Sequence, residues 1–255
     1  MEVWQVLILG AIQGASEFLP ISSTAHLVLA PYFFGWPDLG LAFNVALHLG
    51  TLLAIAIFFW GQWRQILASK KLLMLLALAT LPGVLAGFFF ETQAETTFRA
   101  PLFIAFNLVF FGLFLGLADF FGKKINDWEK LGKAGAILTG IFQAIAILPG
   151  VSRSGATMTG GLVLGLKREA AVKFSFLLSA PIIFGSVVWE GRKLFNGAGT
   201  NGGVWSWILG VLISFASGYL AIKFLSKFVQ KKSLWPFVIY RLVLALVILL
   251  IFFFR

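Results

Sequence analysis

Cysteine is absent from this 255-residue chain, and charged side chains are scarce at 12%. Without cysteine, the chain has no disulfide, zinc–thiolate site, thiol nucleophile or lipidated cysteine. A typical soluble domain carries about 25% charged residues, whereas this chain is 60% hydrophobic and contains 29 phenylalanines. The composition excludes an ordinary soluble globular protein and an intrinsically disordered one. It predicts an integral membrane protein that spans the bilayer several times.

Acidic residues are also scarce, since 20 Lys and Arg outnumber 10 Asp and Glu and give a net charge of +10. We do not expect nucleic-acid binding, because no loop is long enough to form a basic face. In a polytopic membrane protein, basic residues instead fix the topology through the loops and contact anionic lipid headgroups. Membrane lipids are therefore the expected surroundings of the chain.

Ten apolar runs follow one another, and six of them are long enough to cross a hydrocarbon core of about 30 Å as a helix. The long runs lie near residues 41–60, 72–90, 101–121, 171–189, 204–225 and 234–254. The short runs lie near residues 3–19, 24–34, 134–148 and 155–166. Pro20 and Pro149 divide the two pairs of short runs, and proline breaks a helix. Each pair of short runs therefore predicts a re-entrant helical hairpin.

The sequence of two short and three long runs occurs twice, which predicts an internal repeat with a period of about 131 residues. A hairpin adds no net crossing, so each half crosses three times and the second half is inverted relative to the first. We predict an all-α polytopic membrane protein with six full transmembrane helices and two re-entrant hairpins. Residues 1–255 form one membrane domain, with repeat halves at about 1–121 and 134–255.

The basic residues predict the orientation of the chain. Fourteen Lys and Arg fall in loops on one side of the predicted spans and four on the other, with two more inside apolar segments. The richer side is assigned to the cytoplasm. The four on the outer side are Arg99, Arg192, Lys193 and Arg255. The first hairpin then enters from outside, where both termini lie, and the second enters from the cytoplasm.

Polar residues gather at the two hairpin breaks. The first hairpin carries Gln13, Glu17, Ser22, Ser23, Thr24 and His26. The break of the second carries Ser152, Arg153, Ser154 and Thr157. Charges inside a membrane are costly, so function is the default interpretation. A restarted helix offers free N–H groups to an anion, and a buried Arg suits phosphate or carboxylate. The alternatives are a structural Glu17–Arg153 ion pair and a His26 satisfied within the core.

Two other pairs of polar residues lie within the long apolar runs. Asn44 and His48 are four residues apart and share a helix face, where they either line an outer vestibule or pack against another helix. Arg241 and Asp119 both lie in apolar runs, near the same membrane side. We expect these two side chains to form a structural ion pair.

The two hairpin motifs resemble the signature segments of the undecaprenyl-diphosphatase family, also called the bacitracin-resistance phosphatases. The segment QGASEFLPISSTAH carries the first signature, in which Glu or Gln is followed after three residues by Glu, here Gln13 and Glu17. The segment PGVSRSGAT matches the second, PGxSRSxxT, at every fixed position. The segments FSFLLSAP and PFVIYR also resemble the family, so the likeness covers essentially the whole chain.

The resemblance implies a bacterial inner-membrane enzyme that converts undecaprenyl diphosphate to undecaprenyl phosphate and inorganic phosphate. Such an enzyme recycles the lipid carrier of cell-wall synthesis and confers bacitracin resistance. The resemblance assigns catalytic positions to Glu17, Ser23, His26 and Arg153, and substrate-binding positions to Gln13, Ser22, Thr24, Ser152, Ser154 and Thr157. It implies a divalent cation, Mg²⁺ or Ca²⁺, near Glu17, and it allows a homodimer. The predicted hairpin orientation favours an active site on the extracytoplasmic side.

The expected mechanism takes Ser23 as the nucleophile and His26 as its general base, while Arg153 stabilises the transferring phosphoryl group. Attack by a histidine or by water is the rival, because a Ser and a His three residues apart do not fix their roles. The alternative function is an inverted-repeat transporter or flippase of a polyprenyl phosphate lipid, because such repeats also serve alternating access.

Overall fold

The computed structural model describes residues 2–36, 40–195 and 203–254, and within these ranges its regular elements are all helices. The α-helices are α1 (Val3–Phe18), α2 (Ser23–Phe34), α3 (Gly40–Phe58), α4 (Trp60–Ala68), α5 (Lys70–Glu95), α6 (Pro101–Phe121), α7 (Lys133–Ile145), α8 (Arg153–Val163), α9 (Arg168–Phe195), α10 (Gly203–Phe228) and α11 (Trp235–Phe254). Two 3-10 helices are η1 (Thr97–Arg99) and η2 (Trp128–Lys130). The predicted all-α class is confirmed.

Five of the described helices are long and apolar enough to cross a membrane, namely α5, α6, α9, α10 and α11. A sixth crossing is present if α3 and α4 are counted as one span, although they are bent by 75° at their junction. These helices confirm a polytopic membrane protein. The count of six full spans and two hairpins stays a prediction.

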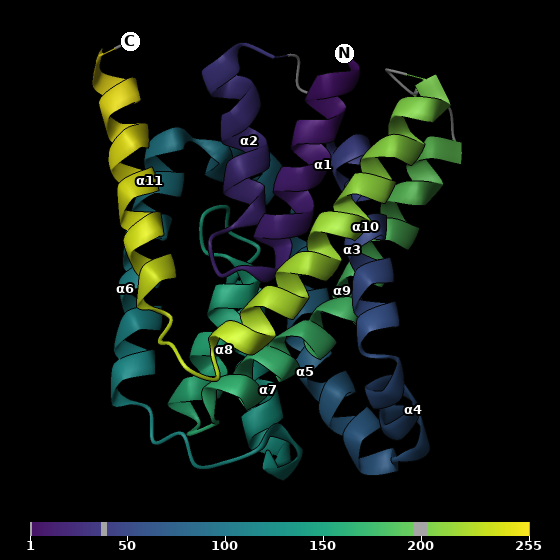
Figure 1. Cartoon of the computed structure of the whole chain (residues 1–255), viewed down its shortest axis with the longest axis vertical. Coiled ribbons are helices and arrows are strands. Elements are labelled where there is room, and N and C mark those ends of the chain that lie inside the picture. Colours follow the sequence, from purple (N-terminus) through teal and green to yellow (C-terminus); the bar gives the residue numbers. More distant parts are fainter. Residues whose placement is uncertain (1, 37–39, 196–202, 255) are drawn as a thin grey trace.

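The four short apolar runs of the sequence form two helical hairpins, α1–α2 and α7–α8. Figure 1 shows the hairpins reaching inward from opposite ends of the molecule, with their turns about halfway along its long axis. Helix α1 packs mainly against α10, and α7 packs mainly against α5. Each hairpin therefore lies on a long helix from the other part of the chain. The predicted division into halves at about 1–121 and 134–255 stays a prediction.

A very close approach of α1 to α10 fixes the position of the first hairpin along α10. At Gly14, an added Cβ would lie 1.9 Å from Ser217 Oγ and 2.3 Å from the carbonyl oxygen of Ser214. Only glycine leaves room for the backbones to pack this closely, as is common between membrane helices. Glu17 lies about one turn further along α1, so this contact positions it.

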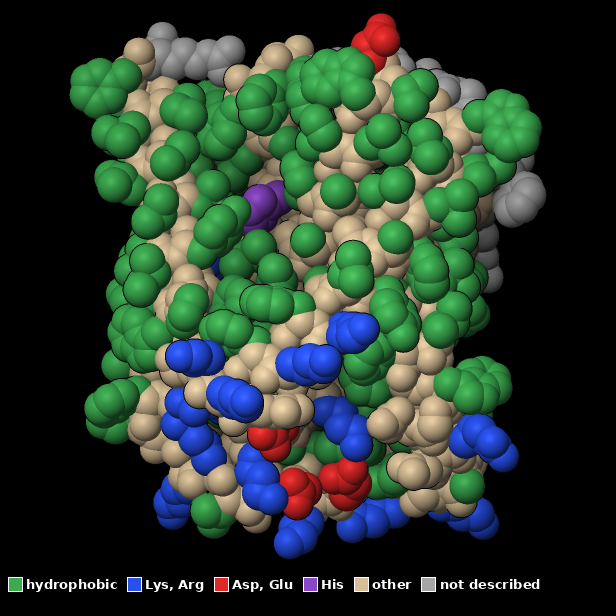
Figure 2. Space-filling view, viewed as in Figure 1, with side chains coloured by type: hydrophobic (Ala, Val, Ile, Leu, Met, Phe, Trp, Pro, Cys, Tyr) green, Lys and Arg blue, Asp and Glu red, His purple; other side chains and the backbone are tan. Residues whose placement is uncertain are grey.

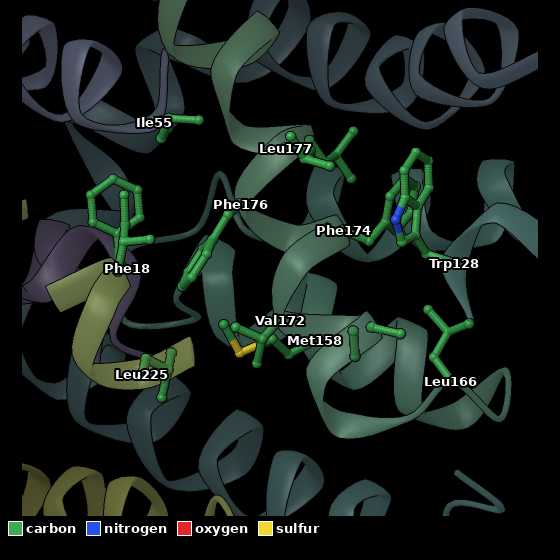
Figure 3. Close-up of a cluster of buried hydrophobic side chains, with 14 of the residues drawn as sticks. Phe18, Ile55, Trp128, Met158, Leu166, Val172, Phe174, Phe176, Leu177 and Leu225 are labelled. Carbon is green, nitrogen blue, oxygen red and sulfur yellow. The ribbon is translucent and has the colours of Figure 1, made fainter. Parts of the chain in front are cut away.

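The buried core lies next to the hairpin turns and includes a cluster of aromatic rings (Figure 3). Phe18, at the end of α1, packs edge-to-face on Phe176 of α9 with ring centroids 5.3 Å apart. Phe174 stacks on Trp128 at the same centroid distance of 5.3 Å. Such rings bury a large apolar area with a specific geometry. The packing of Phe18 holds the last turn of α1, which carries Glu17.

Lys and Arg side chains gather at one end of the molecule in the space-filling view (Figure 2). This is the end opposite the first turns of α1 and the last turns of α11 (Figure 1). The asymmetry agrees with the loop pattern of the sequence. Of the four basic residues predicted for the other side, Arg255 and the side chains of Arg192 and Lys193 lie outside the described residues.

Candidate active site

The first hairpin turn is shaped by Pro20. A residue before proline avoids the helical conformation, and Leu19 is extended, with φ −69° and ψ 140°. Helix α1 therefore ends at Phe18. Ser22 then adopts φ 74° and caps α2, its hydroxyl accepting a hydrogen bond of 3.4 Å from the Ala25 N–H. A positive φ at a residue other than glycine costs about 1–3 kcal/mol and is typical of functional sites.

The second hairpin turn repeats this geometry 130 residues later. Ser152 has φ 71°, and its hydroxyl accepts a hydrogen bond of 3.2 Å from the Gly155 N–H at the start of α8. Gly150, with φ 92°, reverses the chain before it. Ser22 and Ser152 are therefore helix caps, and each starts a helix whose first N–H groups are free for an anion.

Glu17 joins three helices at the point where the turns meet. Its Oε1 accepts a hydrogen bond of 2.8 Å from Arg153 Nη2 on α8. Its Oε2 accepts one of 2.7 Å from Ser23 Oγ on α2 and one of 3.0 Å from Gln13 Nε2 on α1. The Glu17 side chain is only 5% exposed. The acid, the hydroxyl and the guanidinium proposed from the sequence are thus in direct contact.

Ser154 and Thr157 fix the second turn rather than face Glu17. The Ser154 hydroxyl donates a hydrogen bond of 3.0 Å to the carbonyl oxygen of Leu19, which ties the two turns together. The Thr157 hydroxyl donates to the carbonyl oxygen of Arg153 at 2.8 Å and lies 2.6 Å from the hydroxyl of Ser175. Both side chains are buried, so their contacts support the backbone that carries Arg153.

A cavity of about 200 Å³ opens at this meeting point. Its polar wall includes Glu17, Ser22, Ser23, Thr24, His48 and Arg153. Among the described atoms, Arg153 Nη1 is buried and has no hydrogen-bond partner. An unpaired guanidinium nitrogen is costly, so it favours an anion in this space.

His26 does not contact Ser23 by a hydrogen bond in the described part of the chain. Its Nδ1 lies 2.7 Å from the carbonyl oxygen of Ser22, and its Nε2 lies 2.6 Å from the hydroxyl of Tyr240 on α11. The ring also stacks on Tyr240 with centroids 5.7 Å apart. His26 therefore braces the first turn, on the side of α2 that faces α11. Sequence reasoning gave no role to Tyr240.

His48 is the histidine that lines the cavity. Its Nδ1 lies 2.7 Å from the carbonyl oxygen of Asn44, so Nδ1 carries a proton and donates it to that oxygen. Nε2 lies 3.5 Å from Glu17 Oε2. The sequence left His48 between a vestibule and a packing role. The four-residue spacing of Asn44 and His48 predicts that they share a helix face. It does not show which neighbouring helix that face contacts.

The predicted ion pair between Arg241 and Asp119 is wrong. Asp119 pairs with Arg168, accepts a hydrogen bond of 2.9 Å from the Leu234 N–H and lies 3.8 Å from Lys124 Nζ. It is thereby fully satisfied at the basic end of the molecule. Arg241 lies deeper, beside the second hairpin turn.

Arg241 is fully buried, and its guanidinium donates to backbone carbonyls instead of to an acid. The bonds reach Leu108 and Asn107 of α6 at 3.1 and 3.2 Å. They also reach Gly150 and Val151 of the turn at 2.9 and 3.1 Å. Arg241 thus fixes the turn that carries Arg153.

The residues fit a divalent cation only in part. The described residues contain no group of three or more His, Cys, Asp or Glu side chains arranged to hold a metal ion. Glu17 supplies one carboxylate, and the buried Gln13 Oε1 beside it has no hydrogen-bond partner among the described atoms. Mg²⁺ and Ca²⁺ take oxygen ligands of both kinds. A cation would need further oxygens from a bound anion.

Comparisons with known proteins cover nearly the whole chain. Residues 6–247 match the family described as "Bacitracin resistance protein BacA". A protein of Pelotomaculum thermopropionicum named "Undecaprenyl-diphosphatase" is 45% identical over 260 residues, which cover 98% of this chain and 97% of that protein. Proteins of the same name from Moorella thermoacetica and Alcanivorax borkumensis are 45% and 42% identical, covering 100% and 98% of each chain in the pair.

Proposed function

Because the chain belongs to the bacitracin resistance protein BacA family, we infer that it is an undecaprenyl-diphosphatase. It hydrolyses undecaprenyl diphosphate to undecaprenyl phosphate and inorganic phosphate, which recycles the lipid carrier of cell-wall synthesis and gives bacitracin resistance. The observation that carries the inference is the contact of Glu17 with Ser23 and Arg153 where the two hairpins meet. The names of the relatives favour this function over a flippase.

Binding of the diphosphate uses the positive groups of the cavity. Arg153 Nη2 donates to the carboxylate and to the carbonyl oxygen of Glu17, while the unpartnered Nη1 offers a charged donor to a phosphate oxygen. The free N–H groups at the starts of α2 and α8 offer further donors. Positioning and electrostatic stabilisation of this kind supply most of the catalysis in phosphoryl transfer.

The chemical step begins at Ser23. Its oxygen attacks the terminal phosphorus, its proton passes to Glu17, and the bridging P–O bond breaks to release undecaprenyl phosphate. Water then attacks the phosphoserine, which regenerates the hydroxyl and releases inorganic phosphate. The hydrogen bond of 2.7 Å from Ser23 to Glu17 supports Glu17 as the base in place of His26. His26 holds the turn in position through the Ser22 carbonyl.

A trapped phosphoenzyme tests this step. We expect a short incubation with substrate labelled at the terminal phosphate, quenched in acid, to leave label on Ser23 and none in Ser23→Ala. Phosphoserine survives acid, whereas phosphohistidine does not. A parallel quench in base preserves phosphohistidine and therefore detects attack by a histidine. Label on His26, or turnover without any covalent label, would contradict attack by Ser23.

We propose that Mg²⁺ or Ca²⁺ binds with the substrate, held by Glu17 and by phosphate oxygens. When bound, the cation neutralises charge on the diphosphate. Removal of divalent ions with a chelator is expected to reduce phosphate release at least 100-fold, and added Mg²⁺ or Ca²⁺ should restore it. Calorimetry should detect the cation only when a substrate analogue is present. Tight binding to the free protein would contradict a site completed by substrate.

We also propose the bacterial inner membrane as the location, with the cavity open to the extracytoplasmic side. The Lys and Arg at the opposite end of the molecule support this orientation. Undecaprenyl diphosphate is the lipid partner in that membrane. The homodimer stays a prediction.

A further inference from the structure

A groove on the membrane-facing surface runs from the outer end of the molecule down to the first hairpin turn. Its outer part is a hollow of about 670 Å³ lined by Phe33 of α2 and by Leu250, Ile251 and Phe254 of α11. Figure 2 shows the same face hollowed between its apolar side chains, with a histidine at about mid-height. The groove is therefore a feature of the surface that lipid chains contact.

The wall on α11 is one continuous stripe of the helix. Tyr240, Val243, Val247, Leu250 and Phe254 are spaced by three or four residues, which places them on one face. Each is at least 38% exposed, whereas the opposite face, with Ala245 and Ile248, is buried against α6. At about 1.5 Å per residue, the stripe is about 21 Å long. It is long enough to guide an extended chain from mid-membrane to the outer end.

The lower end of the groove is polar and touches the active site. His26 and Phe33 are seven residues apart and share a face of α2. His26 Nε2 lies 2.6 Å from the hydroxyl of Tyr240 across the groove. The other ring nitrogen, Nδ1, contacts the carbonyl oxygen of Ser22. Ser22 and Ser23 line the cavity beyond this pair. The His26–Tyr240 contact thus lies between the apolar groove and the polar site.

We propose that this groove binds the prenyl chain of the substrate, which reaches the cavity past His26 and Tyr240. The proposal rests on the proposed function and names where the lipid part of that substrate lies. A diphosphate in a cavity at mid-membrane needs a lateral exit for its chain, and Ser22 and Ser23 of the cavity wall lie beside the groove. The groove supplies an apolar path that begins next to Ser23. A phospholipid acyl chain is the alternative occupant.

Selective labelling tests the proposal, because the chain has no cysteine of its own. Leu250→Cys is treated with benzyl methanethiosulfonate, which attaches a benzyl group through a disulfide and fills the groove. We expect kcat/KM for the C55 diphosphate to fall at least tenfold on labelling. For geranyl diphosphate, whose C10 chain is too short to span the roughly 15 Å along α11 from Tyr240 to Leu250, it should fall less than twofold. A reductant should reverse both changes, which separates them from misfolding.

The matched control is Leu212→Cys, labelled in the same way. Leu212 is 56% exposed on α10, which packs mainly against α1 and α3, so its label should leave the C55 and C10 rates within twofold. Equal loss on both substrates, no loss on either, or the same loss at Leu212 would overturn the groove as the prenyl site. Failure of the unlabelled protein to release phosphate from either substrate would instead contradict the enzyme itself.

Discussion

Replacement of Arg153 by alanine is expected to lower kcat/KM for undecaprenyl diphosphate by about 1000-fold, or about 4 kcal/mol of transition-state stabilisation. Arg153 is the cation of the cavity wall, and it contacts Glu17 at 2.8 Å while Nη1 stays unpartnered among the described atoms. In the proposed reaction, Nη1 is the nitrogen that is free to bind the charge developing on the transferred phosphoryl group. Steady-state phosphate release in detergent measures the effect. Arg64→Ala, which removes an exposed arginine on α4, is the control and should stay within twofold.

Loss of Arg153 also leaves the Glu17 carboxylate buried without its cation, which can cost about 3–5 kcal/mol of folding stability. The double variant Glu17→Gln/Arg153→Ala removes that unpaired charge. Thermal unfolding of the double variant should therefore lie closer to that of the original protein than thermal unfolding of Arg153→Ala does. Equal destabilisation of the single and the double variant would contradict the unpaired Glu17 charge as the cause.

Replacement of Glu17 by glutamine is expected to lower kcat by about 100- to 10,000-fold, because the amide keeps the size of the side chain but cannot take a proton from Ser23. An acceptor oxygen remains for Arg153, and the divalent cation is kept at a saturating concentration, so KM should change much less than kcat. Initial rates over a range of substrate concentrations separate the two parameters. Glu129→Gln is the matched control, since Glu129 is exposed and pairs with Lys173. A Glu17→Gln variant with a tenth or more of the original kcat would exclude Glu17 as the base.

The fold could be predicted from local features of the chain. Pro20 and Pro149 divide the short apolar runs, and α1 ends two residues before Pro20. The short helix α4 was missed, because the apolar run near 41–60 ends at the bend and the following residues up to Ala68 are more polar. Hydropathy predicts where a segment is apolar, but it does not show that a more polar segment after the span forms a further helix.

The sequence predicts the residues of the candidate site that belong to the two hairpin motifs, but not the residues that other helices bring to it. Glu17, Ser23 and Arg153 come together as expected, because each lies at a hairpin turn whose buried polar groups need hydrogen-bond partners. The partner of Arg241 could not be predicted, because spacing along one helix does not show which neighbouring helix its face meets. The same limit applies to His48 and Tyr240, whose contacts with Glu17 and His26 join distant segments.

The bonds of Arg241 make one side of the site much stiffer than the other. Four carbonyls, on α6 and on the second turn, accept hydrogen bonds from its charged side chain. At about 1.5–3 kcal/mol for each bond to a charged group, displacing α11 or that turn is costly. Among the described residues, the hydrogen bond between the opposing hairpin and α11 is that of His26 with Tyr240, worth about 0.5–1.5 kcal/mol. Relative to α11, α2 with Ser23 is therefore held by weaker polar contacts than the turn that carries Arg153.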